Sequence, residues 1–174
     1  EASILALIDG EHIVLLASSQ DHKRIFEKDE GPNTGGMGAY SPASIVNEVV
    51  REKVIREVYE PMLAELKKRG ITYKGVLYAG LMIQDDQPAV VEFNCRFGDP
   101  ETQAVLARWD GDMLPALEAV VDGTLSNDLI HWKSEPSACV VMVAGGYPGT
   151  DANGLPLGNI ALANEVQDTV VFHA

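Results

Sequence analysis

Six apolar side chains recur at every fourth position between residues 46 and 66, and this pattern restricts the fold more than any other feature. They are Val46, Val50, Val54, Val58, Met62 and Leu66. Apolar residues at this spacing share one face of an α-helix, so the segment from Ser44 to Arg69 predicts an amphipathic helix. The stripe must be buried against another layer, which makes the helix part of the scaffold.

Two details define this helix further. Pro61 lacks a backbone N–H, which predicts a kink or a division into two consecutive helices. The basic run Lys67–Arg69 complements the negative end of the helix dipole. Gly70 suits the position just past the helix end, where a left-handed backbone is common.

Four strand-like segments are expected, in two hairpins. Ala2–Ile8 and His12–Ala17 flank the turn dipeptide Asp9-Gly10. Tyr73–Gln84 and Pro88–Asn94 flank a second polar turn. Each pair should run antiparallel. Hairpins combined with one long helix predict an α+β fold, an antiparallel sheet backed by helices.

Shorter elements follow these hairpins. Asp99 suits a helix N-cap with Pro100 at the first helical position, which predicts a helix that ends at Trp109. A further helix is expected from Asp112 to Asp122, and an apolar strand from Ala138 to Ala144.

A change of composition near residue 133 predicts a domain boundary there. Residues 1–132 would form the first domain, and residues 133–174 the beginning of a small, β-rich second one. The chain opens directly in a strand-like run, and residues 169–174 read as another strand with nothing after it. We therefore expect a fragment of a longer polypeptide.

The charge of the chain limits its partners. Thirteen basic residues against twenty-six acidic ones leave a formal charge of −13, which argues against nucleic acid and anionic membrane. No apolar run approaches the ~20 residues that cross a bilayer. Cys95 and Cys139 lie beside apolar runs without metal-ligand spacing, which predicts two reduced core thiols and a cytoplasmic location.

Glu92, Asn94 and Arg96 carry the strongest chemical signal. They follow the apolar run Pro88–Val91, which predicts the body of a strand. Alternate residues of a strand share a face, so we expect these three side chains to project together, with Phe93 on the other side. Carboxylate and amide oxygens suit a hard cation such as Mg²⁺, and a guanidinium suits phosphate. The pattern alone also fits an edge strand with solvent-facing polar residues.

The neighbouring residues favour the first interpretation. Gly98-Asp99-Pro100-Glu101 predicts a helix start beside the strand end, and the free N–H groups of a helix start attract anions. Cation ligands next to an anion pocket describe a metal–phosphate site.

Two polar clusters lie in the long connection from Ser18 to Ala43. Residues 31–38 (GPNTGGMG) contain glycines that allow backbone amides to face a ligand, although a plain flexible loop fits equally well. Residues 19–24 (SQDHKR) join two cations, an imidazole and a carboxylate, which in isolation describe a solvated turn.

In combination, these segments resemble the phosphoribosylamine–glycine ligase (glycinamide ribonucleotide synthetase) family of the ATP-grasp superfamily. The resemblance rests on an ordered set of motifs along the whole chain: SQDHKR at 19–24, GPNTGGMGAYSP at 31–42, YAGLMI at 78–83, EFNCRFGDPET at 92–102 and AGGYPG at 144–149. It implies that residues 1–132 are the second half of an ATP-grasp module and that residues 133–174 begin the C-terminal domain.

The resemblance also implies a reaction and its cofactors. Members join glycine to 5-phosphoribosylamine with ATP, through a glycyl phosphate, in purine biosynthesis. Glu92 and Asn94 would be ligands of Mg²⁺ or Mn²⁺, and Arg96 would steady the transferring phosphoryl group. The resemblance places in the binding of ATP and substrate Asp21, His22, Lys23, Arg24, Asn33, Thr34, Gly35, Gly36, Gly38, Asp99 and Glu101.

The family has further parts that this chain lacks. An upstream amine-binding domain and the other half of the nucleotide clamp, which bears a phosphate-contacting lysine, would precede Glu1. We therefore expect the isolated chain to be inactive and the longer parent to be the enzyme. Two alternatives stay open: another ATP-grasp carboxylate–amine ligase, and a non-catalytic structural or assembly domain.

Overall fold

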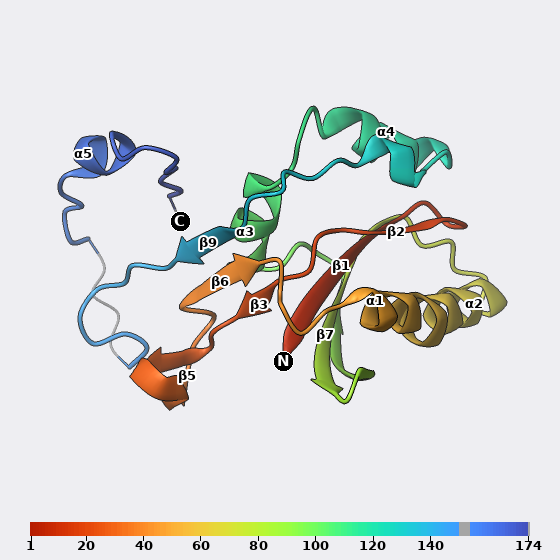
Figure 1. The fold of residues 1–174 in the computed structure, drawn as a ribbon, viewed down its shortest axis with the longest axis horizontal. Helices are drawn as coiled ribbons and strands as arrows, with labels where there is room; N and C mark the ends of the chain where they lie inside the picture. Colours follow the sequence, from red (N-terminus) through yellow and green to blue (C-terminus); the bar gives the residue numbers. More distant parts are fainter. Residues whose placement is uncertain (150–153, 174) are drawn as a thin grey trace. The chain divides into compact units, whose positions relative to one another are not determined.

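The computed structural model describes residues 1–149 and 154–173. These residues fall into two compact units, Glu1–Val141 and Met142–Ala174, and each unit is described by itself. The first unit contains two larger groups of paired strands, a long helical rod and two shorter helices (Figure 1).

The expected amphipathic helix is present as one continuous rod. It consists of α1 (Glu48–Val54), a π-helical turn η2 (Ile55–Tyr59) and α2 (Glu60–Lys68). The rod begins four residues later than predicted because Asn47 is its N-cap, with an extended backbone and a side chain that accepts a hydrogen bond from Val50 N at 2.9 Å.

The interruption expected at Pro61 is the π turn that directly precedes it. Pro61 lies in the first turn of α2, directly after the π turn, so its missing N–H falls where the helical hydrogen bonds change from the π to the α pattern. The C-terminal end is also as predicted, since Gly70 adopts a left-handed backbone. The Gly70 and Ile71 amides donate to the carbonyls of Lys67 and Leu66 at 3.0 and 2.9 Å, which satisfies the last turn.

A four-stranded antiparallel sheet packs against this rod. Its strand order is β2-β1-β7-β8, and the strands are β1 (Ala2–Ile8), β2 (Ile13–Leu15), β7 (Gly75–Gln84) and β8 (Gln87–Asn94). Both predicted hairpins are confirmed. The sequence did not predict that the two hairpins pair with each other through β1 and β7. In this pairing Ala2 lies opposite Leu81 and Ile8 opposite Gly75.

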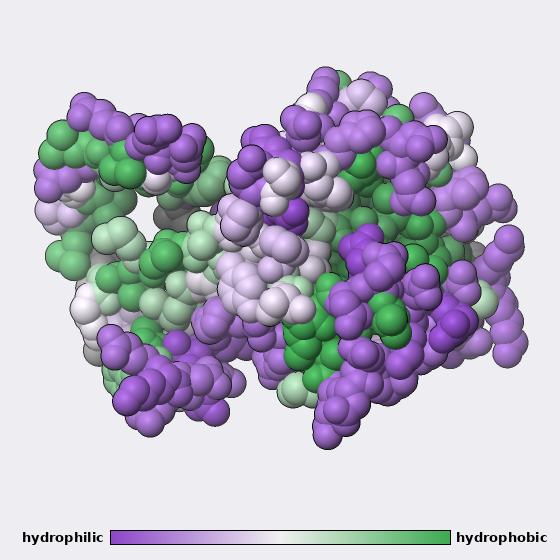
Figure 2. Space-filling model, in the orientation of Figure 1, coloured by the Kyte–Doolittle hydropathy of each residue, from purple (hydrophilic) through white to green (hydrophobic). Residues whose placement is uncertain are grey.

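Both faces of this sheet are covered. On one face, Val50, Val54, Val58 and Tyr59 of the rod meet alternate residues of β1 and β7. On the other face, α3 (Glu101–Ala107) and α4 (Leu114–Asp122) supply a second apolar cluster that includes Trp109. All seven residues of β1 are buried, because this strand lies between both clusters. The outer side of the helical rod is hydrophilic (Figure 2). A sheet backed by helices confirms the prediction of an α+β fold.

The start of α3 differs from the prediction. The helix runs from Glu101 to Ala107, with Pro100 as its cap residue, and no side chain caps it. Asp99 is therefore not the N-cap; its carboxylate instead accepts a hydrogen bond from Gln103 Nε2 at 2.8 Å. The helix α4 ends as expected, with Gly123 in the left-handed conformation. A single turn of 3₁₀ helix, η3 (Asn127–Leu129), follows.

The long connection between residues 18 and 43 contains short strands rather than an unstructured loop. A three-stranded sheet has the order β3-β6-β9, formed by β3 (Gln20–Asp21), β6 (Gly38–Ser41) and β9 (Ser137–Val140). A two-stranded ribbon pairs β4 (Arg24–Phe26) with β5 (Glu30–Asn33) around the short turn η1 (Glu27–Asp29). Backbone hydrogen bonds therefore anchor a segment that has few apolar residues of its own.

The expected strand from Ala138 to Ala144 is shorter, because β9 ends at Val140. Residues 137–140 pair with β6 and belong to the first unit, whose last residue is Val141. The boundary near residue 133 concerns the domains of a longer protein and stays a prediction.

The second unit contains a single short helix, α5 (Ile160–Asn164), among its described residues. Residues 169–173 are not a strand, contrary to the prediction, and Ala174 lies outside the described residues. Within the described ranges, no helix is long and apolar enough to cross a membrane.

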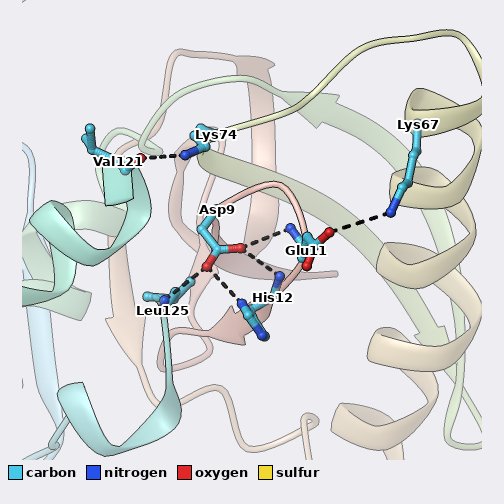
Figure 3. Close-up of polar contacts among 7 residues, drawn as sticks. All are labelled: Asp9, Glu11, His12, Lys67, Lys74, Val121 and Leu125. Carbon is cyan, nitrogen blue, oxygen red and sulfur yellow. Dashed lines mark hydrogen bonds and ion pairs between the residues drawn. The ribbon is translucent and has the colours of Figure 1, made fainter. Parts of the chain in front are cut away.

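Asp9 joins the β1–β2 turn to the loop that follows α4 (Figure 3). Its buried carboxylate accepts hydrogen bonds from the amides of Glu11, His12 and Leu125 at 2.9, 2.7 and 3.0 Å, and lies 2.9 Å from His12 Nδ1. Burial alone would raise the pKa of Asp9, but these hydrogen bonds outweigh it and hold that pKa well below its ordinary value of 3.8.

We expect Asp9→Asn to lower the free energy of unfolding by about 1–3 kcal/mol at pH 7, because an amide group would face the Leu125 and His12 donors. Since the folded-state pKa is depressed, this stabilisation is full above the unfolded value near 3.8 and is lost as the pH falls below it. Urea unfolding at several pH values measures both effects. Glu11→Gln is the control, because the Glu11 side chain forms an ion pair with exposed Lys67, at 3.7 Å. Equal losses in both variants would contradict the prediction.

Gly36 provides a second test of packing, because its backbone lies against Pro100. Its φ is +127°, and an added Cβ would lie 2.4 Å from Pro100 Cδ. We expect Gly36→Ala to destabilise the protein by about 1–3 kcal/mol, through strain and displacement of the loop. Chemical denaturation measures the loss. Gly145→Ala is the control, since its Cβ would meet open space; an equal change in both variants would refute the packing argument.

Candidate functional site

Glu92 and Asn94 lie near the end of β8, at the edge of the four-stranded sheet. Glu92 is opposite Gly80 of β7, and Asn94 is opposite Tyr78. Directly opposed residues of antiparallel strands place their side chains on the same face. The two predicted metal ligands therefore share the face of the sheet that carries Tyr78.

A β-bulge determines which face this is. Gly80 pairs with Glu92 but Leu81 pairs with Val90, so Val91 is an extra residue in β8. Without it, Glu92 would continue the alternation of Pro88 and Val90 and face the helical rod. With it, Phe93 packs against the cluster beneath the rod, and Glu92 and Asn94 turn to the opposite face.

Arg96 lies outside β8, so strand alternation does not determine where its side chain points. β8 ends at Asn94, and Cys95 and Arg96 form a bend. Cys95 is exposed there and Cys139 is half-buried, so the prediction of two core thiols was wrong. The Arg96 guanidinium is exposed and donates to the carbonyl of Phe97 at 2.9 Å. Strand alternation therefore does not apply to Arg96, and its expected position beside Glu92 and Asn94 stays a prediction.

A buried hydrogen-bond network lies beside the two metal-ligand candidates. Tyr78 Oη and Ser3 Oγ donate to Glu101 Oε1 at 2.8 and 2.9 Å, and the two hydroxyl oxygens lie 2.8 Å apart. All three residues are at most 4% exposed. Burial raises the pKa of Tyr78, and the negative charges of Glu101 and Asp21 support this shift, so the phenol remains a hydrogen-bond donor.

Two glycines allow the network to pack this closely. A Cβ on Gly80 would lie 3.2 Å from Glu92 Cγ and 3.4 Å from Tyr78 Cε1. A Cβ on Gly98 would lie 2.6 Å from Glu101 Oε2 and 3.0 Å from Tyr78 Cε2. A side chain at position 98 would therefore displace the buried Glu101 carboxylate, whereas one at position 80 would require Glu92 to shift by a few tenths of an ångström.

The start of α3 is not an open anion pocket. Its first residue is the buried carboxylate of Glu101, and Thr102 N already donates to Gly98 O at 3.2 Å. The predicted pocket beside the strand end therefore presents a carboxylate, whose oxygen Oε1 is held by the two hydroxyls described above.

Asp21 and Lys23 bring the second sequence cluster to the same place. The Asp21 side chain is 6% exposed, and Lys23 Nζ lies 3.8 Å from it. Burial raises the pKa of Asp21 and so does the charge of Glu101, while Lys23 opposes this shift. Asp21, Lys23, Ser3, Tyr78 and Glu92 together line a small cavity of about 20 Å³. This space holds about one water and is far too small for a nucleotide.

The glycine-rich stretch is hydrogen bonded to this cluster. Thr34 N and Oγ1 donate to Lys23 O at 2.7 and 2.8 Å. Met37 N donates to His22 O and His22 N to Gly38 O, at 2.7 and 2.9 Å. The two motifs that the sequence separates thus form one layer, which reaches Pro100 through Gly36.

The remaining candidates lie further along this layer. Arg24 pairs with Asn33 across the β4–β5 ribbon, where both side chains are exposed. The Arg24 guanidinium donates to Gly31 O. Gly35 also lies in this layer and is exposed. These contacts keep the ribbon near the site without bringing Arg24 or Asn33 into its small cavity.

Sequence reasoning missed Ser3 and Tyr78. Each is a polar residue inside an otherwise apolar strand, and each is buried. A polar side chain at a buried position needs a partner, and this requirement was the signal that could have identified them.

The donor set fits a hard divalent cation. Glu92 and Asn94 offer a carboxylate and an amide oxygen on one face, next to an acidic cavity. Among the described residues, no three acidic, histidine or cysteine side chains form a complete metal cluster. Oxygens from a nucleotide or water would have to complete the coordination.

A larger hollow of about 790 Å³ lies at the other end of β1, between the β1–β2 turn, α2 and residues 125–127. None of the predicted site residues lines it. Its position beside Asp9 associates it with the stabilising contacts of Figure 3 rather than with the motif residues.

Comparison with known proteins identifies the family of the chain. Residues 1–102 match the family model described as "Phosphoribosylglycinamide synthetase, ATP-grasp (A) domain". The phosphoribosylamine–glycine ligase of Escherichia coli O157:H7 is 47% identical over 175 aligned residues, which cover all of this chain and 41% of that protein. The corresponding protein of Allochromatium vinosum is 54% identical over 149 residues, which cover 85% of this chain and 35% of that protein.

A solved structure agrees in fold. The crystal structure of phosphoribosylamine–glycine ligase from Thermotoga maritima aligns with a TM-score of 0.72 and 33% identity, over 85% of this chain and 37% of that one. The chain thus spans well under half the length of these relatives. The resemblance drawn from the motifs is confirmed, and the chain belongs to the phosphoribosylglycinamide synthetase family, whose ATP-grasp (A) domain its residues 1–102 match.

Proposed function

We propose that this chain is the part of a phosphoribosylamine–glycine ligase that carries the metal-binding side of the ATP site. The longer protein would join glycine to 5-phosphoribosylamine, with ATP converted to ADP and phosphate. The single observation that supports this most is the placement of Glu92 and Asn94 side by side, opposite Gly80 and Tyr78, on the face that also carries Asp21 and Lys23.

The proposed roles follow from chemistry and position. Glu92 and Asn94 would hold Mg²⁺ or Mn²⁺, which when bound neutralises phosphate charge and orients the γ-phosphate. Arg96 is exposed just beyond these residues and would contact the transferring phosphoryl group. Lys23 supplies a cation at the rim of the cavity, and its neighbour Asp21 holds it there.

The loop layer would serve to bind substrate and exclude water. Backbone hydrogen bonds tie His22 to Gly38 and Thr34 to Lys23, and the Gly36 amide donates to Thr34 Oγ1, so this layer would move as one body. An acyl phosphate such as glycyl phosphate hydrolyses readily, and a closing layer would protect it. Asn33, Gly35 and Arg24 would form its outer rim, whereas Asp99 and Glu101 would bound it from the α3 side.

We expect Glu92→Gln in the full-length enzyme to reduce Mg²⁺-dependent ADP formation at least ~100-fold, because one anionic ligand is lost from the charge-stabilising site. The exposed position of Glu92 predicts an unchanged fold, which circular dichroism checks. Glu48→Gln is the matched control, since Glu48 is exposed on the helical rod and forms an ion pair with Arg51, at 3.8 Å. Unchanged turnover in Glu92→Gln would refute the metal role.

Substrate tests with the full-length enzyme distinguish a glycine ligase from another ATP-grasp ligase and from a structural domain. Glycine should support ADP formation with 5-phosphoribosylamine better than other amino acids and carboxylates do. A different preferred carboxylate would indicate another ATP-grasp carboxylate–amine ligase. ADP formation with none of them would favour a structural or assembly role.

We expect the isolated chain to bind Mg–ATP more weakly than micromolar, because its cavity of about 20 Å³ is far too small to enclose a nucleotide. Titration calorimetry with purified chain and Mg–ATP measures this affinity. Micromolar binding would show that the clamp of the longer relatives is unnecessary, and would contradict the expectation.

A further inference from the structure

Tyr78 begins a motif that matches the family, residues 78–83, but the proposed function assigns no role to it. It lies in the middle of β7, between Leu5 of β1 and Asn94 of β8. Its side chain is 4% exposed and lies on the face of the metal-ligand candidates. A buried phenol in the centre of an apolar strand requires an explanation.

The ring of Tyr78 separates two parts of the site. Its Cε1 edge faces the space above Gly80, where Glu92 Cγ also lies. Its Cε2 edge faces Gly98, the first residue of the turn that leads into α3. The ring therefore determines the distance between the metal-ligand strand and this turn.

The hydroxyl of Tyr78 joins the start of α3 to β1. It donates to Glu101 Oε1 at 2.8 Å and lies 2.8 Å from Ser3 Oγ. Glu101 is the first residue of α3, and Ser3 is on β1, so one hydroxyl connects the start of a helix to the central strand of the sheet. Removal of this donor would leave a buried carboxylate with one hydrogen bond fewer.

We propose that Tyr78 is a positioning residue, which holds Glu92 and Asn94 in a fixed relation to the Gly98–Glu101 turn. This inference rests on the proposed function, because it concerns the same metal and nucleotide. Phosphoryl transfer depends on the placement of charged groups to within about 1 Å. Groups that orient metal ligands from outside typically change metal affinity or activity about 10- to 100-fold when removed.

Tyr59 provides a matched control within the same chain. It is also a fully buried tyrosine, and its hydroxyl donates to Ile4 O at 2.8 Å and Leu77 O at 3.0 Å. It packs with the cluster beneath the helical rod, on the opposite face of the sheet from Tyr78. Tyr59→Phe therefore removes a comparable buried hydroxyl without touching the site.

The experiment compares Tyr78→Phe, Tyr59→Phe and wild type in the full-length enzyme. Two quantities are measured: the affinity for Mn²⁺ in the presence of ADP, by electron paramagnetic resonance, and kcat and KM for each substrate. We expect Tyr78→Phe to weaken Mn²⁺ binding about 10-fold and to lower kcat about 10- to 100-fold, with each KM within about 3-fold. Tyr59→Phe should match wild type in both.

Each other outcome has a defined meaning. Equal values in Tyr78→Phe and wild type, or equal losses in both variants, would overturn the positioning role. If Tyr78→Phe does not fold, Ser3→Ala removes the second donor to Glu101 and should change Mn²⁺ affinity in the same direction; an unchanged affinity would overturn the proposal. If wild type binds Mn–ADP but does not use glycine, the proposed function fails while the Mn²⁺ comparison still decides the role of Tyr78. A wild type that binds no Mn–ADP overturns both.

Discussion

The pairing of β1 with β7 is the interaction on which the rest of this structure depends. It joins residues 2–8 to residues 75–81 in one antiparallel register and so unites two hairpins that are distant in sequence. Both apolar clusters contain alternate residues of these two strands. Loss of this pairing would expose both clusters together, because β1 is buried on both faces.

The two ends of β1 carry polar groups with different roles, one in stability and one in the candidate site. At the end of β1, the buried carboxylate of Asp9 closes the turn and holds the loop after α4. At its beginning, Ser3 contributes to the network with Tyr78 and Glu101. The two polar groups are separated by six residue steps of extended strand, or about 20 Å. Substitutions at the two ends should therefore affect different properties, since distant sites act independently.

The chemistry of the site depends on small deviations from regular structure. One extra residue at Val91 turns Glu92 and Asn94 away from the helical rod, and two glycines allow Tyr78 to lie between Glu92 and Glu101. Bulges and close backbone approaches of this kind are common beside functional sites, because they direct a side chain without altering the surrounding sheet. The matching stretches of the family, YAGLMI and EFNCRFGDPET, contain these residues together.

The sequence by itself determined the elements whose signals are local. The apolar stripe from Val46 to Leu66, the Asp9-Gly10 turn and the glycines at positions 70 and 123 act through neighbouring residues, and each was recognised without coordinates. The motif order identified the family, and Glu92 and Asn94 were correctly placed on a common face. The prediction that Asp99 is the N-cap was wrong. Pro100 is the cap residue, and the Asp99 carboxylate accepts a hydrogen bond from Gln103 instead.

Only the tertiary structure decided which distant segments meet. The union of β1 with β7, the face to which Glu92 turns, and the contacts of Ser3 and Tyr78 with Glu101 all depend on strand register. Strand register is set by the packing of whole sheet faces and by a bulge that the local sequence pattern does not predict. Local sequence specifies turns and periodicity because their energies involve near neighbours, whereas the site is built from residues up to 98 positions apart, whose proximity results from burial of the complete core.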